Sequence, residues 1–188
     1  MSNQTLKDYM ARVFSAVDIN EKELLDELEQ LRDRLDLGFK PVPREKMHIT
    51  LEFFEDAGEE EIEELKAAMQ EVDVEPFELE ITGVGAFPSE DYIRVVWAGA
   101  EHEKLHELYS EVSDHSLESS NDHDFTPHIT LMRVENVTGE DKRKLRKMLR
   151  EHRHHRFDRT CRVEKVTLFE SQLTGNGSRY TRLYEEEL

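Results

Sequence analysis

The sequence predicts an α+β protein with two lobes, and three features of the chain indicate this fold class. Short segments of strand character alternate with amphipathic helical segments. Two strand segments flank a Pro-Ser-Glu-Asp turn at 88–91, and such hairpins argue against a purely parallel sheet. The tetrapeptide His-Ile-Thr-Leu occurs at both 48–51 and 128–131. We therefore expect an internal duplication within one domain, 1–188, whose two lobes are related by a pseudo-twofold axis that brings the two motifs together across one cleft.

The first half of the chain shows strand and helix patterns in turn. Leucines at helical spacing predict a helix over 21–35, with Asn20 as a possible cap and Gly38 after its end. β-Branched and aromatic residues predict the strands, and apolar residues on one face predict a second helix. The expected segments are strand 12–19, strand 47–54, helix 57–72, and hairpin strands 77–87 and 92–98.

The second half repeats this plan, with the strand that ends at 98 serving as its opening strand. Thr138 is positioned to cap a helix that runs to about residue 151. A Gly-Asn-Gly turn at 175–177 separates two closing strands. The expected segments are helix 101–117, polar loop 119–124, strand 128–134, and closing strands 162–172 and 179–187.

The amino-acid composition excludes several classes of protein. The net charge of −18 argues against a broad polyanion-binding surface. It fits either a high-salt environment, where ions screen self-repulsion, or ordinary acidic solubility. Cys161 is the only cysteine, so an intramolecular disulfide and a cysteine-based zinc finger are excluded. No apolar run is long enough to span a bilayer, and residues 1–10 are polar, so we expect a cytoplasmic protein without a membrane partner.

The repeated motif places an imidazole and a hydroxyl on one face of each strand. Side chains two positions apart in a strand share a face, so His48 lies with Thr50 and His128 lies with Thr130. Two histidines can supply the base and the acid that an in-line phosphoester displacement needs near neutral pH. The threonine hydroxyls can donate hydrogen bonds to the phosphate oxygens. This chemistry predicts catalytic histidines and requires no metal or cofactor.

At these residues the sequence resembles the RNA 2′,3′-cyclic phosphodiesterase, or 2′-5′ RNA ligase-like, family of the two-histidine phosphoesterases. The resemblance extends over nearly the whole chain through the segments 12–18, 43–51, 95–97, 127–133, 167–171 and 179–181. It implies hydrolysis of 2′,3′-cyclic phosphates on RNA ends or nucleotides to 2′-phosphates, with 2′-5′ ligation in some members. It also implies a two-lobed α+β fold, in which two antiparallel sheets carry outer helices and a central cleft holds both His-x-Thr motifs. We expect a monomer. The competing class is a non-catalytic nucleotide- or RNA-binding protein with the same cleft.

The resemblance also suggests roles for single residues. By analogy, His48 is the acid that protonates the leaving 3′-oxygen and His128 is the base that activates water, although identical motifs leave this division open. Arg133 matches an arginine near the substrate phosphate, against a simpler interpretation as a surface residue. Phe14 matches an aromatic beside the nucleoside, against a simpler interpretation as a core residue.

Two further patterns suggest other functions. Residues 102–106 spell His-Glu-Lys-Leu-His, the zinc-ligand spacing of some metallopeptidases on a helix, but no third ligand is apparent. Residues 142–159 form a basic, histidine-containing run that either contacts an RNA strand or is a solvated helix face. The sequence has no Gly-x-Ser-x-Gly motif and no glycine-rich phosphate loop, so a serine nucleophile and ATP dependence are not expected.

Overall fold

The computed structural model describes residues 10–113, 124–135, 137–175 and 177–188. In this part of the chain, antiparallel strands pair in the order β7-β4-β5-β6-β3-β1-β8-β9, and the short β2 pairs with β6. The strands are β1 Ala11–Asp18, β2 Lys40–Pro41, β3 His48–Ala57, β4 Phe77–Ser89, β5 Tyr92–Ala100, β6 His128–Arg133, β7 Arg156–Val163, β8 Lys165–Thr174 and β9 Gly177–Glu187. The helices are α1 Lys22–Leu35, the 3-10 turn η1 Arg44–Lys46, α2 Glu59–Gln70, α3 Glu103–Val112 and α4 Gly139–His152.

Apart from the short β2, which is attached to β6, the sheet consists of two halves of four strands each, which are the two lobes that the duplicated sequence predicts. One half is β7-β4-β5-β6, and the other is β3-β1-β8-β9. The halves meet where β3 and β6 pair, and the register of that pair is centred on Ile49 and Ile129. Each half therefore carries its copy of the repeated motif on the strand nearest the partner half, as a pseudo-twofold relation requires.

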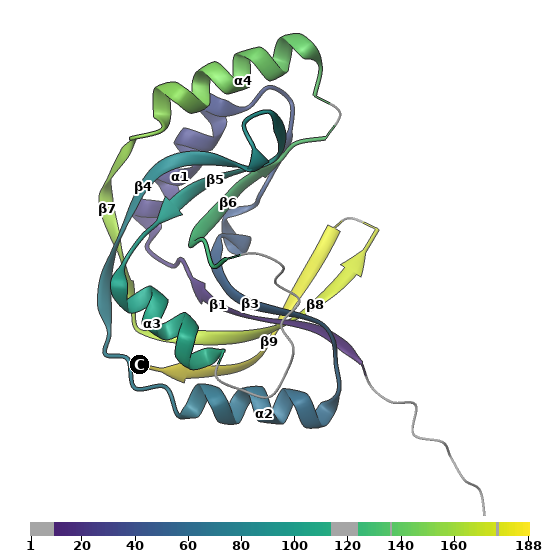
Figure 1. Cartoon of the computed structure of the whole chain (residues 1–188), viewed down its shortest axis with the longest axis vertical. Helices are drawn as coiled ribbons and strands as arrows, with labels where there is room; N and C mark the ends of the chain where they lie inside the picture. The colour runs from purple at the N-terminus through teal and green to yellow at the C-terminus, as the bar shows by residue number, and fades with distance from the viewer. Residues whose placement is uncertain (1–9, 114–123, 136, 176) are drawn as a thin grey trace, which may run out of the picture.

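The helices cover the two halves separately (Figure 1). α1 and α4 lie over the half that contains β4, β5 and β6, whereas α2 and α3 lie at the opposite end, against β9 and β3. Leu31 and Leu35 of α1 share a buried cluster with Leu145 and Leu149 of α4. The helical spacing of these leucines produces one apolar stripe on each helix, and burying that stripe against the sheet stabilises the helices.

The predicted boundaries hold to within a few residues at most elements. Thr138 is the N-cap of α4, and its hydroxyl accepts a hydrogen bond from the Asp141 backbone N–H. Pro88 and Ser89 belong to β4, so the hairpin turn is tighter than the predicted four residues. The last part of the predicted helix 101–117, most of the loop 119–124 and Asn176 of the predicted turn lie outside the described residues.

Two strands were not predicted, the two-residue β2 and the longer β7. The sequence interpretation extended the basic run through Arg159 and began a closing strand at Arg162, whereas Arg156–Val163 form a separate strand that pairs with β4. β7 is an edge strand whose outward residues are charged and exposed, so its strand pattern is hidden within the basic run. Within the described residues, no helix is both long and apolar enough to cross a membrane.

Candidate active site

Both His-x-Thr motifs begin a strand at the junction of the two halves. His48 is the first residue of β3, and His128 is the first residue of β6. The central isoleucine of each motif is fully buried and pairs with the other across the junction. Because side chains alternate along a strand, each histidine and threonine point away from the isoleucine side. The antiparallel register sets His48 opposite Thr130 and Thr50 opposite His128.

The imidazole of His128 is held by a backbone acceptor and two aromatic rings. Its Nδ1 lies 2.7 Å from the carbonyl oxygen of Thr126. A carbonyl can only accept, so Nδ1 carries the proton, and in the neutral ring Nε2 keeps its lone pair. Phe87 contacts the ring edge-on at a centroid distance of 4.8 Å, and Trp97 lies at 6.1 Å. Burial lowers the pKa of His128, and the Thr126 hydrogen bond opposes that shift.

The imidazole of His48 lies in a different, more aromatic setting. Phe14 stacks on it at 5.0 Å, and Tyr180 meets it edge-on at 5.6 Å. Burial lowers the pKa of His48 to about 4, although a backbone hydrogen bond with Lys46 favours the charged ring. The positive charge of a protonated His128 acts in the same direction as burial. The two histidines are therefore close enough for the proton on one to disfavour the proton on the other.

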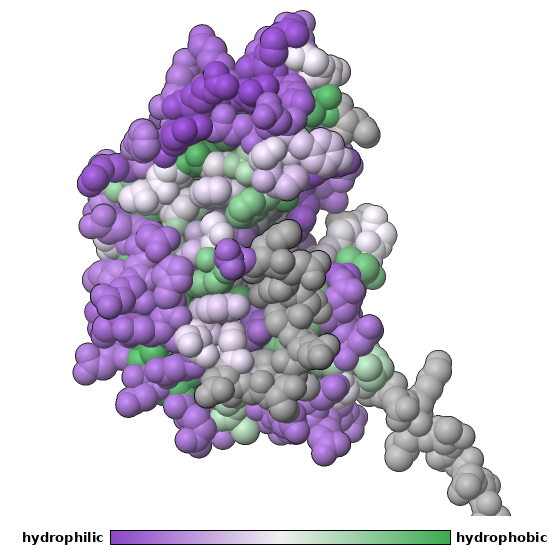
Figure 2. Space-filling view, in the orientation of Figure 1, coloured by the Kyte–Doolittle hydropathy of each residue, from purple (hydrophilic) through white to green (hydrophobic). Residues whose placement is uncertain are grey.

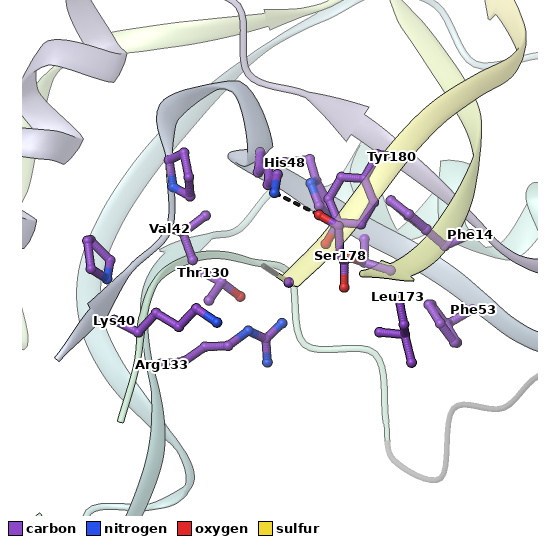
Figure 3. A pocket seen from close by; sticks show the side chains of 15 residues that line it. Phe14, Lys40, Val42, His48, Phe53, Thr130, Arg133, Leu173, Ser178 and Tyr180 are labelled. Atoms are coloured by element: carbon purple, nitrogen blue, oxygen red, sulfur yellow. Dashed lines mark hydrogen bonds between the residues drawn. The ribbon is translucent and has the colours of Figure 1, made fainter. Parts of the chain in front are cut away.

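A cavity of about 410 Å³ opens beside the two motifs (Figure 3). His48, Thr50 and Thr130 line it, and His128 is not among its lining residues. The remaining walls come from β1, from the segment that contains β2 and η1, and from the β8–β9 hairpin. The cavity is open to solvent, and a ligand in it would contact His48 and the threonines of both motifs.

Arg133 and Phe14 both border this cavity but differ in exposure. Arg133 ends β6, is exposed, and extends into the cavity beside Lys40 (Figure 3). Its charge also contributes to the low pKa of His48. Phe14 is only 2% exposed and packs with Phe169 beneath His48, so little of its surface is available to a nucleoside. These contacts agree with its simpler interpretation as a core residue that supports the histidine.

Several residues of the cavity were not singled out from the sequence. Lys40, Lys46 and Tyr180 line it together with the predicted residues. The Nζ of Lys46 donates to the carbonyl oxygen of Ser178 at 2.7 Å, which ties η1 to the β8–β9 hairpin. No local pattern marks these residues, since they come from a proline-containing loop and a hairpin that are far apart in the sequence.

The other suggested patterns do not converge on this site. His102 is the N-cap of α3, where its Nδ1 accepts from the Lys104 backbone N–H, so it is not on the helix face that the zinc-site interpretation needs. The second histidine of that pattern, His106, has its Nε2 2.8 Å from the Oε1 of Glu101. The basic run is divided between α4 and β7. Cys161 is buried, and burial raises the pKa of its thiol, which makes it a poor nucleophile.

Paired His-x-Thr strands at the junction of two antiparallel halves define a two-histidine phosphoesterase. The chain belongs to the family described as LigT like Phosphoesterase, whose model matches it twice, at residues 17–97 and 99–180. Each match contains one copy of the motif. The double match therefore confirms the internal duplication that the sequence predicts.

Relatives with similar sequences support this assignment. A protein of Methanothermobacter thermautotrophicus named RNA 2′,3′-cyclic phosphodiesterase is 34% identical over 178 residues, which cover 90% of this chain and 95% of the relative. One of the same name from Methanocaldococcus jannaschii is 28% identical over 177 residues, or 93% and 99% of the two chains.

Solved structures show the same fold. The crystal structure of TT0787 from Thermus thermophilus superposes with a TM-score of 0.76 at 29% identity, covering 94% of this chain and 97% of the other. Escherichia coli LigT complexed with 3′-AMP gives 0.68 at 22% identity, with coverage of 95% and 98%. The second likeness concerns the fold alone.

Proposed function

We propose that this chain is a phosphodiesterase that hydrolyses 2′,3′-cyclic phosphates at RNA ends to 2′-phosphates, with His48 and His128 as its acid–base pair. The observation that carries the proposal is the junction of β3 and β6, where two identical His-x-Thr faces meet beside an open cavity. The names of the archaeal relatives support the same substrate. We further propose that 1–188 acts as one two-lobed domain, because one site takes residues from both halves. A monomeric state and a cytoplasmic location are part of the same proposal.

In the proposed reaction, one histidine removes a proton from water and the other donates a proton to the leaving oxygen. Nε2 of His128 accepts the proton of the water whose oxygen attacks phosphorus. The bond between phosphorus and the 3′-oxygen breaks, and His48 protonates that oxygen, so one water is consumed and a 2′-phosphate remains. The Nδ1–H bond of His128 to Thr126 supports this role, because it leaves Nε2 as the acceptor. This division of roles follows the resemblance. The reverse assignment, with His48 as the base and His128 as the acid, would use the same arrangement of side chains.

Three further side chains are proposed to bind the phosphate. The hydroxyls of Thr50 and Thr130 line the cavity and can donate to the non-bridging oxygens as charge builds there. Arg133 adds a fixed positive charge at the same cavity. Phe14 is proposed to hold the ring of His48 by stacking, rather than to contact the base.

In this scheme the negative charge of the substrate determines when the catalytic acid is protonated. Burial lowers the pKa of both histidines, so both rings are neutral at pH 7 in the free protein. The acid must nevertheless carry a proton when it acts. An anionic phosphate bound between the rings favours protonation of one of them. The protonated acid is thus formed chiefly when substrate is present.

The test is turnover of 2′,3′-cyclic AMP and of an RNA that ends in a 2′,3′-cyclic phosphate, with EDTA present. We expect 2′-phosphate products, and a loss of about two orders of magnitude or more in His48→Ala and in His128→Ala. His106→Ala, an exposed histidine outside the cleft, is the matched control and should keep full activity. If the intact protein binds the product nucleotide but turns over neither substrate, the cleft is a binding site and the proposal fails.

A further inference from the structure

The cavity beside the two motifs differs in charge from the rest of this acidic chain. The sequence has 43 aspartates and glutamates. Among the described residues that line the cavity, none is acidic, whereas Lys40, Lys46 and Arg133 are cationic. A wall with three cations and no acid favours the binding of an anion.

Two of these cations are directly opposite each other in the sheet. Lys40 of β2 is the register partner of Arg133 of β6. Like charges in this arrangement repel and destabilise the strand pair. Within the described part of the chain, neither side chain has a carboxylate partner that would relieve the repulsion. A bound anion would relieve it, so the pair indicates a ligand site rather than a stabilising contact.

The third cation continues this wall toward the β8–β9 hairpin. Lys46 is fixed by its hydrogen bond to the Ser178 carbonyl oxygen, and its Nζ lies 5.8 Å from the ring centre of Tyr180. Lys40 reaches the same hairpin, since a Cβ added at Gly177 would lie 3.8 Å from the Lys40 Nζ. The two lysines therefore lie beside the β8–β9 hairpin. The threonines proposed to bind the cyclic phosphate, Thr50 and Thr130, lie instead on β3 and β6.

The basic side chains of α4, which give the hydrophilic crest in Figure 2, form a weaker candidate for an anion site. Three of them form ion pairs, with nitrogen–oxygen distances of 3.0 Å for Arg146–Asp91, 3.6 Å for Arg150–Glu90, and 3.7 Å for Lys147–Glu151 within the helix. These carboxylates offset much of the positive charge. The cavity, whose walls carry no carboxylate among the described residues, is the better match for a nucleic-acid phosphate.

We propose that Lys40 and Lys46 form a second phosphate site, which holds the phosphodiester linking the terminal nucleotide to the preceding one. A cyclic phosphate carries one negative charge, which Arg133 can balance together with the hydroxyls of Thr50 and Thr130. Two additional lysines exceed that need and match one more phosphate. The inference rests on the proposed function and names its substrate class, RNA ends of two or more nucleotides rather than cyclic mononucleotides.

The test compares two dinucleotides that end in a 2′,3′-cyclic phosphate and differ only in the linkage. One has the natural anionic phosphodiester, and the other has a neutral methylphosphonate. For the intact protein we expect kcat/KM to be about tenfold higher with the anionic linkage, in line with a charge-assisted hydrogen bond at a partly exposed site. In Lys40→Gln this preference should fall to about twofold or less, while Lys22→Gln, an exposed lysine on α1, should retain it.

The outcomes separate the two proposals. An equal loss on both dinucleotides in Lys40→Gln would place Lys40 at the cyclic phosphate, and an unchanged preference would remove it from the site; either result overturns the inference. If neither dinucleotide is turned over, the proposed function fails. The affinities of the two corresponding 2′-phosphate products, measured by calorimetry, would then decide the second site independently, because Lys40→Gln should reduce only the affinity for the anionic one.

Discussion

The partly buried imidazole of His48 makes the stability of this protein depend on pH, and one substitution should remove that dependence. The pKa of His48 falls from its ordinary 6.5 to about 4 because of burial. Above pH 6.5 the ring is neutral in both the folded and the unfolded chain. Between pH 6.5 and 4 the unfolded chain binds a proton that the folded chain does not, so the free energy of unfolding decreases as pH falls.

The size of this effect follows from the same shift. Each pH unit in that interval is worth about 1.4 kcal/mol, which gives about 2 kcal/mol lost between pH 7 and pH 4.5 after allowance for solvent at the half-buried ring. His48→Gln has no titrating ring and should escape this loss. The many carboxylates of the chain titrate equally in both proteins, so their contribution cancels in the difference.

Urea denaturation of the two proteins at pH 7 and pH 4.5 measures this difference. We expect the free energy of unfolding of His48→Gln, relative to the intact protein, to rise by about 2 kcal/mol on going from pH 7 to pH 4.5. His106→Gln removes an exposed histidine and serves as the control, with a smaller change. A relative stability of His48→Gln that is the same at both pH values would refute the assigned burial of the ring.

Two further predictions concern activity. The pH profile of kcat/KM should be bell-shaped with its maximum below pH 6.5, because the pKa values of His48 and His128 both lie below that of a free histidine; a maximum at pH 7 or above would contradict this. In Gly85→Ala the added Cβ would lie 2.2 Å from the ring of Trp97, which neighbours His128. We therefore expect a lower kcat/KM, a shift in the fluorescence of this sole tryptophan, and a loss of about 1–3 kcal/mol in stability. A Cβ added at Gly139 would meet no atom within 4 Å, so Gly139→Ala should change neither kcat/KM nor the tryptophan fluorescence.

The sequence was sufficient to predict the parts of the fold that local periodicity determines. Leucines at helical spacing predicted α1, and Thr138 predicted the start of α4, since a cap and an apolar stripe are local features. The repeated tetrapeptide predicted two strands with the same polar face, because alternation along a strand depends only on the strand itself. Duplication then supplied the long-range relation between them, which one copy alone would not have shown.

What the sequence did not reveal depends on pairing between distant segments. β2 has only two residues, and nothing local indicates that Lys40 faces Arg133 across the sheet. The strand β7 has apolar residues at alternate positions such as Cys161 and Val163, but the surrounding charges obscured that pattern. Phe14 looked equally suited to a core or to a nucleoside, and only the packing of β8 against β1 shows how deeply it is buried.

Two identical tetrapeptides need different surroundings if their histidines are to serve as acid and base. The duplicated strands supply equal geometry, and the residues around them differ between the halves. His48 is packed between Phe14 and Tyr180, whereas His128 is fixed by the Thr126 carbonyl oxygen and bordered by Phe87. Unequal environments give unequal proton affinities, which is how one type of side chain can serve in two roles. The division of labour that we propose therefore depends on the neighbours of the motifs, and exchanging those neighbours should alter it more than any change within the motifs that keeps both histidines.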